Sequence, residues 1–209
     1  DQILELYAVE DWLNDNKMLL KRMNPSAFFA ISTADLEKIS SRSTPNQVLA
    51  IVRKKKDPQE ITVPPGVFLM LDGIQDPGNF GTIVRIADWF GISTILCSPE
   101  CADLYNPKVV QSTMGSLLRV NVIYTNLAAW CKTNAGAEVY AATLHGKSIY
   151  QRSPLTHGAI LMGNESKGVH PELLHLCKEQ ITIPRTGLAE SLNAAVATGI
   201  ILSHLVKQV

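Results

Sequence analysis

The sequence predicts an α/β fold: a parallel β-sheet with helices on both faces, preceded by a truncated small α/β domain. After residue 66, short apolar segments alternate with segments of helical periodicity, a pattern typical of a parallel sheet covered on both sides. Hydrophobic residues make up 46% of the 209 residues and charged residues 18%, so the chain can bury a substantial core. A segment rich in lysine and proline separates the two parts.

Residues 66–209 are expected to contain six strands and five helices. Apolar runs predict the strands 67–72, 94–97, 120–123, 139–143, 159–163 and 181–184. Helical periodicity predicts the helices 80–90, 107–115, 125–133, 171–177 and 191–206. Ligands of such sheets bind at the carboxyl ends of the strands, where this sequence has loops rich in Gly, Asn and Glu.

The first 55 residues are expected to be the remainder of a small α/β domain whose beginning is missing. Its predicted elements are helices at 10–22 and 33–40 and strands at 28–32 and 48–52. Residues 56–65 are predicted to be a linker, because like charges repel and prolines disfavour regular structure. The charge run Arg53–Lys56 either contacts a nucleic-acid backbone or is simply solvated.

Charge and cysteine usage narrow the class of protein. Lysine plus arginine equals aspartate plus glutamate, at 19 each, which excludes a polycation that binds nucleic acid by bulk charge but leaves room for a local basic patch. The four cysteines form no CxxC pair and the histidines no HExxH motif, so no metal site is expected. Reduced thiols and the absence of an 18-residue apolar run predict a cytoplasmic protein without a membrane span.

The first informative loop, Asp72–Gly81, follows a predicted strand and leads into a helix. Asn79 is expected to cap this helix and Gly91 to end it. Arg85 lies nearly opposite the face that should pack on the sheet, next to Trp89. It is either a solvated arginine beside an exposed tryptophan or part of a partner or subunit surface. The residues expected to pack on the sheet are Ile83, Ile86, Ala87 and Phe90.

The second loop, Gly163–Gly168, has the glycine separation of a phosphate-binding P-loop. Val169 and His170 follow where a P-loop needs Lys and Ser or Thr, so a nucleotide triphosphate site is not supported. The chain also lacks GxGxxG, which argues against a dinucleotide site. The glycines either let backbone groups approach a ligand closely or form a plain strand-to-helix turn with Glu165 exposed.

The third stretch, Ile183–Asn193, leads into a helix with small residues on one side. Those small residues indicate that something packs very close to the helix. Ser191 is interpreted either as a helix N-cap or as a functional hydroxyl. A hydrolase nucleophile is disfavoured, because the chain has no GxSxG motif.

Taken in order, the three stretches resemble the motifs of the SpoU/TrmH branch of the SPOUT RNA methyltransferases. The match runs N-x-G-x-x-x-R-x-A at Asn79–Ala87, G-N-E-x-x-G at Gly163–Gly168, and I-P-x-x-G-x-x-x-S-L-N at Ile183–Asn193. The resemblance covers residues 66–209, and residues 1–55 resemble the tail of the ribosomal-protein-like domain with which many members bind their RNA substrate.

The resemblance implies a C-terminal deep trefoil knot, S-adenosylmethionine as cofactor and a homodimer in which two subunits complete the site. Spacing alone would not suggest a knot, since chains generally avoid them. The residues implied to bind the cofactor, largely through backbone groups, are Thr143, Leu144, Gly146, Gly163, Asn164, Ile183 and Leu192.

The implied reaction transfers the methyl group to a ribose 2′-hydroxyl of rRNA or tRNA. The resemblance makes Arg85 the general base, although a guanidinium stays protonated unless its pKa is lowered. Otherwise Arg85 stabilises the developing alkoxide or holds a phosphate. Arg119 either contacts phosphate or is a plain surface arginine. The residues implied to position the reacting groups by hydrogen bonds are Asn79, Glu165, Ser191 and Asn193.

Two other functions remain to be weighed. A knotted RNA-binding or ribosome-assembly protein that has lost catalysis would share the fold, but the retained polar motif residues argue against it. An oxidoreductase of ordinary doubly wound topology is disfavoured by the missing GxGxxG.

Overall fold

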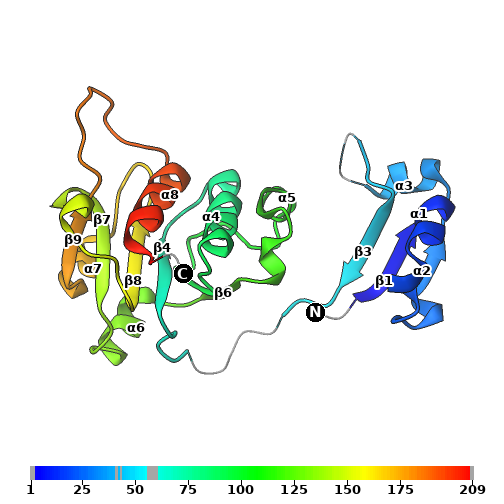
Figure 1. Cartoon of the computed structure of the whole chain (residues 1–209), viewed down its shortest axis with the longest axis horizontal. Helices are drawn as coiled ribbons and strands as arrows, with labels where there is room; N and C mark the ends of the chain where they lie inside the picture. The colour runs from blue at the N-terminus through cyan, green and yellow to red at the C-terminus, as the bar shows by residue number, and fades with distance from the viewer. Residues whose placement is uncertain (1–2, 41, 43, 56–60, 208–209) are drawn as a thin grey trace. The chain divides into compact units, whose positions relative to one another are not determined.

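The computed structural model describes residues 3–40, 42, 44–55 and 61–207. The chain divides into two compact units, Asp1–Lys56 and Asp57–Val209, here called the N-terminal and C-terminal units (Figure 1). The expected linker, 56–65, lies partly outside the described residues, and its described part, 61–65, forms neither helix nor strand. Lys56 of the predicted basic run also lies outside them.

The N-terminal unit is a three-stranded sheet in the order β2-β1-β3, in which β1 pairs parallel with β2 and antiparallel with β3. The sequence analysis did not identify β1. The single helix expected at 10–22 is wrong, because it is interrupted at Asn16, whose side chain donates a hydrogen bond to the Trp12 carbonyl. The elements are β1 (Ile3–Ala8), α1 (Glu10–Asp15), α2 (Lys17–Leu20), η1 (Pro25–Ala27), β2 (Phe28–Ala30), α3 (Thr33–Ile39) and β3 (Val48–Val52).

The C-terminal unit contains a six-stranded sheet in the order β6-β5-β4-β8-β7-β9, and every neighbouring pair is parallel. The predicted parallel sheet is therefore confirmed. The largest difference is at β7, which continues to Ser148 instead of ending at residue 143. The strands are β4 (Val67–Asp72), β5 (Thr94–Cys97), β6 (Asn121–Tyr124), β7 (Val139–Ser148), β8 (Gly158–Gly163) and β9 (Glu179–Thr182).

Helices cover both faces of this sheet, as predicted. The alternation along β4 shows it: Leu69 and Leu71 pack with α4 and α8, whereas Phe68 and Met70 pack with α6 and α7. The helices are α4 (Pro77–Trp89), α5 (Pro107–Thr113), η2 (Ser116–Leu118), α6 (Leu127–Thr133), η3 (Ile149–Gln151), α7 (Pro171–Leu176) and α8 (Ala194–Leu205).

Two expected helix caps are wrong, and both corrections matter for the site. Helix α4 is capped by Asp76, whose carboxylate accepts a hydrogen bond from the Asn79 amide at 2.7 Å. Asn79 therefore lies inside the first turn. Helix α8 is capped by Asn193, so Ser191 lies outside the helix that was expected to begin there. An N-cap side chain accepts a hydrogen bond from the second or third backbone amide of its helix. Asp76, three residues before Asn79, does so in α4. Asn193, two residues after Ser191, does so in α8.

Arg119 joins two elements of the C-terminal unit. Its guanidinium donates to the Asp88 carboxylate at 2.9 and 2.7 Å and so ties η2 to the end of α4. The hydrogen bonds from Arg119 lower the pKa of Asp88. This pairing favours the interpretation of Arg119 as a surface arginine with a structural role.

Gly81 lies where α4 packs closely against α5. A Cβ added there would lie 2.6 Å from Ser112 Cβ and 2.7 Å from the Val109 carbonyl oxygen. Substituting Gly81→Ala should destabilise the protein by about 1–3 kcal/mol, because the helices must move apart. Urea unfolding measures this change.

The matched control is Gly136→Ala, since a Cβ at Gly136 meets nothing within 4 Å. Its free energy of unfolding should stay within about 0.5 kcal/mol of wild type. Equal stability of the two variants would contradict the packing role of Gly81.

Candidate functional site

One hydrogen-bond chain connects the three stretches that the sequence analysis singled out. Asn193 Nδ2 donates to Asn79 Oδ1 at 2.8 Å, and Asn79 Nδ2 donates to Glu165 Oε1 at 2.8 Å. These side chains lie 114 and 86 positions apart in the sequence. The fold therefore brings three of the five predicted catalytic residues into direct contact.

The direction of this chain follows from the helix caps. Asn193 Oδ1 accepts from the amides of Ala195 and Val196, so only its Nδ2 is left to face Asn79. Asn79 must then present its oxygen to Asn193 and its nitrogen to Glu165. An ionised carboxylate only accepts hydrogen bonds, so Glu165 fits as the terminal acceptor.

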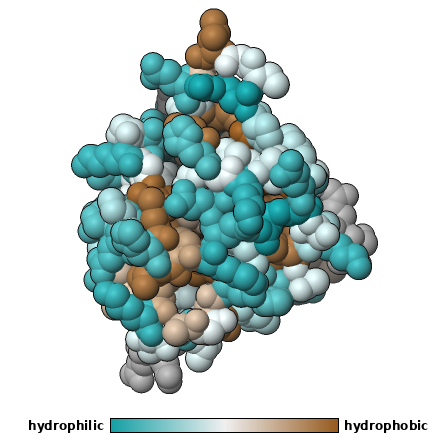
Figure 2. Space-filling view, turned by 90° about the vertical axis from the view of Figure 1, so that its left-hand side faces the viewer, coloured by the Kyte–Doolittle hydropathy of each residue, from teal (hydrophilic) through white to brown (hydrophobic). Residues whose placement is uncertain are grey.

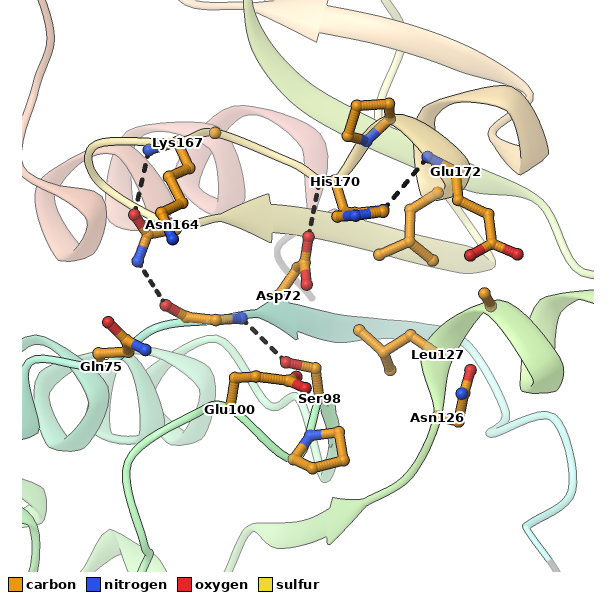
Figure 3. Close-up of a pocket in the computed structure, with 16 residues that line it drawn as sticks. Asp72, Gln75, Ser98, Glu100, Asn126, Leu127, Asn164, Lys167, His170 and Glu172 are labelled. Atoms are coloured by element: carbon orange, nitrogen blue, oxygen red, sulfur yellow. Dashed lines mark hydrogen bonds between the residues drawn. The ribbon is translucent and has the colours of Figure 1, made fainter.

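The loop between β8 and α7 is held on the end of β4 (Figure 3). Asn164 Nδ2 donates to the Gly73 carbonyl at 2.7 Å, and the His170 amide donates to Asp72 Oδ2 at 2.7 Å. Asn164 Oδ1 also accepts from the Ser166 and Lys167 amides. The side chain of Asn164 therefore shapes the loop that carries Glu165.

Gly163 is required by the packing of its own loop. A Cβ on Gly163 would lie 2.3 Å from the Val169 nitrogen and 2.4 Å from the Gly168 carbonyl carbon. The loop thus needs glycine for its own closure, and close approach to a ligand is not required to explain the residue. Gly168 adopts a φ of +70°, which also favours glycine.

The remaining predicted cofactor residues lie on β7 and beyond β9. Ala142 and Lys147 both pair with Ile181, so the intervening residues 143–146 bulge out of the ladder. Thr143 Oγ1 donates to Gln180 Oε1 at 3.3 Å. A Cβ on Gly146 would lie 2.5 Å from the Ile181 nitrogen. The bulge therefore lies directly against β9, two residues before Ile183.

Apolar side chains are exposed on these loops. Leu144 is 65% exposed, Leu192 47% and Leu188 100%. Figure 2 shows apolar side chains at the tip of the segment between β9 and α8, at the top of the view. Exposed leucines next to tightly packed backbone are suited to covering an apolar ring system.

Arg85 and Ser191 do not join the hydrogen-bond chain. Both are exposed, and neither makes a hydrogen bond or ion pair within the part of the chain that the structure describes. Arg85 follows Asn79 by six residues, which moves it about 9 Å along the helix and about 240° around it. A single copy thus leaves Arg85 apart from Glu165.

A groove with a volume of about 360 Å³ runs between α4 and α8 next to this chain. Asn79 and Asn193 lie at one end of it, and Ile86 and Ile200 line its apolar part. Trp89, on α4, is 84% exposed, as both interpretations of this helix face expected: an exposed tryptophan beside a solvated arginine, or a surface for a partner or second subunit.

Two functional residues escaped the sequence analysis. Asp76 caps α4, and Asp72 holds the β8–α7 loop through His170. The pair Asp76-Pro77 is a recognisable start signal, because Pro is favoured at the first helical position after a capping residue. Nothing local could have indicated the partner of Asp72.

No helix in the described ranges is long and apolar enough to cross a membrane. Among the same residues, no three His, Cys, Asp or Glu side chains gather into a group that could hold a metal ion.

Comparison with known proteins agrees with the three-motif site. Residues 66–203 match the model of the SpoU rRNA Methylase family. The 23S rRNA (guanosine(2553)-2′-O)-methyltransferase RlmP of Bacillus subtilis is 32% identical over 180 residues, covering 85% of this chain and 71% of the relative.

Two solved structures are similar over nearly the whole chain. A putative RNA methyltransferase of the TrmH family from Porphyromonas gingivalis has a TM-score of 0.85 and 34% identity, covering 97% of this chain and 82% of that one. The SpoU methyltransferase AviRb from Streptomyces viridochromogenes, in complex with AdoMet, has a TM-score of 0.81 and 25% identity, covering 98% and 82%. The chain belongs to the SpoU rRNA methylase family.

Proposed function

We propose that this protein transfers a methyl group from S-adenosylmethionine to a ribose 2′-hydroxyl of rRNA or tRNA. The observation that carries the proposal is the hydrogen-bond chain Asn193–Asn79–Glu165, which joins all three motif loops at one place. The name of the Bacillus relative and the AdoMet complex of AviRb support the same reaction and cofactor.

The loops beyond β7 and β9 fit the cofactor. Exposed Leu144 and Leu192 offer apolar contacts to an adenine ring, and the backbone near Gly146 and Ile183 offers polar groups. Thr143, Gly163 and Asn164 complete the proposed set, with the Asn164 side chain acting through the loop it shapes. S-adenosylmethionine supplies an electrophilic methyl group when bound.

The chain's own residues have to orient and polarise a poor nucleophile. Asn79 fixes the Glu165 carboxylate in one orientation, so this carboxylate can accept a hydrogen bond from the ribose hydroxyl. The Arg85 guanidinium stabilises the developing alkoxide or holds the adjacent phosphate. Ser191 supplies a further hydroxyl from the β9–α8 loop. Holding these groups in place lowers the entropic part of the barrier.

The protein acts as a homodimer in this proposal. The α4–α8 groove, with exposed Trp89 and Val196 beside it, offers an apolar surface for a second copy. Arg85 lies on the same helix, so pairing of two copies would place the Arg85 of one next to the Glu165 of the other. This would explain why one copy leaves Arg85 without a partner.

Three further features belong to the proposal. The C-terminal segment is threaded as a deep trefoil knot, a topology suggested by the motif resemblance. Residues 1–55 act as a partial RNA substrate-binding domain of the ribosomal-protein-like type. The protein works in the cytoplasm, where ribosomal RNA is assembled and where the four free cysteines stay reduced.

Methyl transfer itself is the direct test. Labelled S-adenosylmethionine and total RNA from a strain lacking the modification should yield label in a 2′-O-methylated nucleoside after nuclease digestion. S-adenosylmethionine should also raise the melting temperature of the protein, because the ligand binds the folded state. RNA binding without any stabilisation by S-adenosylmethionine would instead support the non-catalytic alternative.

Asn79→Asp tests the hydrogen-bond chain. The variant loses the N–H group that donates to Glu165 and places a second carboxylate next to the Glu165 carboxylate. The pKa of one of these two carboxyl groups must therefore rise. At neutral pH, methyl transfer should fall at least about tenfold, and it should partly recover as the pH falls and one carboxyl regains a proton. A pH–rate profile of both proteins checks this.

The control for that substitution is Asn134→Asp, because Asn134 donates to the Trp130 carbonyl in a similar way outside the site. Its rate and pH profile should match wild type. If the Asn79 variant also matched wild type, the chain would have no role in the reaction.

Arg85→Ala should leave the affinity for S-adenosylmethionine nearly unchanged and abolish methyl transfer. Mixing this variant with Glu165→Ala tests whether Arg85 acts across the dimer. Half of the randomly mixed dimers are hybrids with one complete site, so about a quarter of wild-type activity should return. No recovery after verified subunit exchange would show that both residues must come from one chain.

A further inference from the structure

A second cavity lies at the carboxyl ends of β4, β5 and β8, on the side of the sheet covered by α6 and α7 (Figure 3). Its volume is about 540 Å³, within the range of pockets that hold small organic ligands. Buried Leu127 and Leu173 contribute an apolar floor, and Pro99 and Pro171 line it as well. The cavity can therefore accept the face of a flat ring.

This cavity shares two walls with the site described above. One wall is the β4–α4 turn, where Gly73 and Gln75 line the cavity a few residues before Asn79. The other is the β8–α7 loop, where Asn164 and Gly168 line it on either side of Glu165. An RNA strand whose ribose lies at Glu165 could thus place a base in the cavity.

The polar lining of the cavity carries both acceptors and donors, and the ammonium group of Lys167 is among the donors. Three carboxylates, those of Asp72, Glu100 and Glu172, border the cavity. Glu172 is paired with Lys132 at 2.6 Å, and one oxygen of Asp72 is taken by the His170 amide. Glu100 is exposed at the rim, where its carboxylate can turn toward a ligand.

Electrostatics decide which ligand suits this lining. The Ser98 hydroxyl hydrogen-bonds to Glu100 and lowers the pKa of its carboxyl group, with further help from its own backbone and His170. Glu100 is therefore ionised at neutral pH and accepts hydrogen bonds without donating them. Of the three carboxylates, Glu172 is paired with Lys132, so Asp72 and Glu100 remain, and an ionised carboxylate that is free to accept favours a ring edge with two N–H groups.

We propose that this cavity binds a guanine base of the substrate RNA, with the Glu100 carboxylate accepting from its N1–H and N2–H groups. Guanine offers these two donors side by side, in the geometry that a carboxylate accepts as a pair. Adenine lacks an N1–H donor, and hypoxanthine lacks the N2 amino group. The inference rests on the proposed function, because it assumes that RNA is the substrate.

Mononucleotides test the cavity on the intact chain. Guanosine, inosine and adenosine monophosphates are titrated separately, and backbone amide chemical shifts are recorded. Guanosine monophosphate should shift the amides of Gln75, Glu100 and Asn126 in a saturable manner. Inosine monophosphate should bind about tenfold more weakly, because it loses one hydrogen bond to a charged acceptor.

Glu100→Gln should remove the preference for guanosine over inosine monophosphate, while the stabilisation by S-adenosylmethionine stays unchanged. The matched control is Glu37→Gln, an exposed carboxylate of the N-terminal unit, which should keep the preference. The nucleotide comparison on wild-type protein remains decisive even if the Glu100 variant is unstable.

Three results would overturn the inference. They are equal binding of the three nucleotides, the same shifts with inorganic phosphate alone, or no saturable shift in a protein that methylates RNA. The last result would leave the proposed function intact. Guanosine-selective binding in a protein that never transfers a methyl group would instead reject the proposed function and keep the cavity's specificity.

Discussion

The candidate site depends on the two hydrogen bonds made by the side-chain amide of Asn79. A carboxamide offers a donor and an acceptor from one rigid plane. Its oxygen meets Asn193 and its nitrogen meets Glu165, so its orientation is fixed by both neighbours. If the plane turned over, donor would face donor and the Glu165 carboxylate would lose its partner.

The parallel sheet makes this meeting possible. The carboxyl ends of β4 and β8 are adjacent, with Asp72 paired opposite Gly163. The loops that leave these two strands are therefore neighbours before any side chain is considered. Asp72 and Gly73 then hold the β8–α7 loop through two hydrogen bonds. These bonds keep Glu165 at the N-terminal end of α4, next to Asn79.

The two helices of the groove carry different residues of the candidate site. Asn79 lies in the first turn of α4 and Asn193 caps α8, and both contact the loops, whereas Arg85 lies beyond the first turn of α4 and is exposed. In the proposed homodimer, the Arg85 of one copy would act at the site of the other, so the two copies need a surface on which to pair. The apolar groove and exposed Trp89 next to Arg85 provide such a surface.

The sequence by itself determined the features that depend on near neighbours. The bounds of β4 and β5 were predicted to the residue, because apolar runs between turn residues are local signals. The motif spacing also indicated the family. The local roles of Asn79 and Gly163 were decided by the three-dimensional structure. Asp76 caps α4 in place of Asn79, and the backbone of Gly168 folds back against Gly163 and leaves no room for a Cβ atom. The pairing of Asn79 with Glu165 joins positions 86 apart, and no local pattern contains the strand order that makes them neighbours.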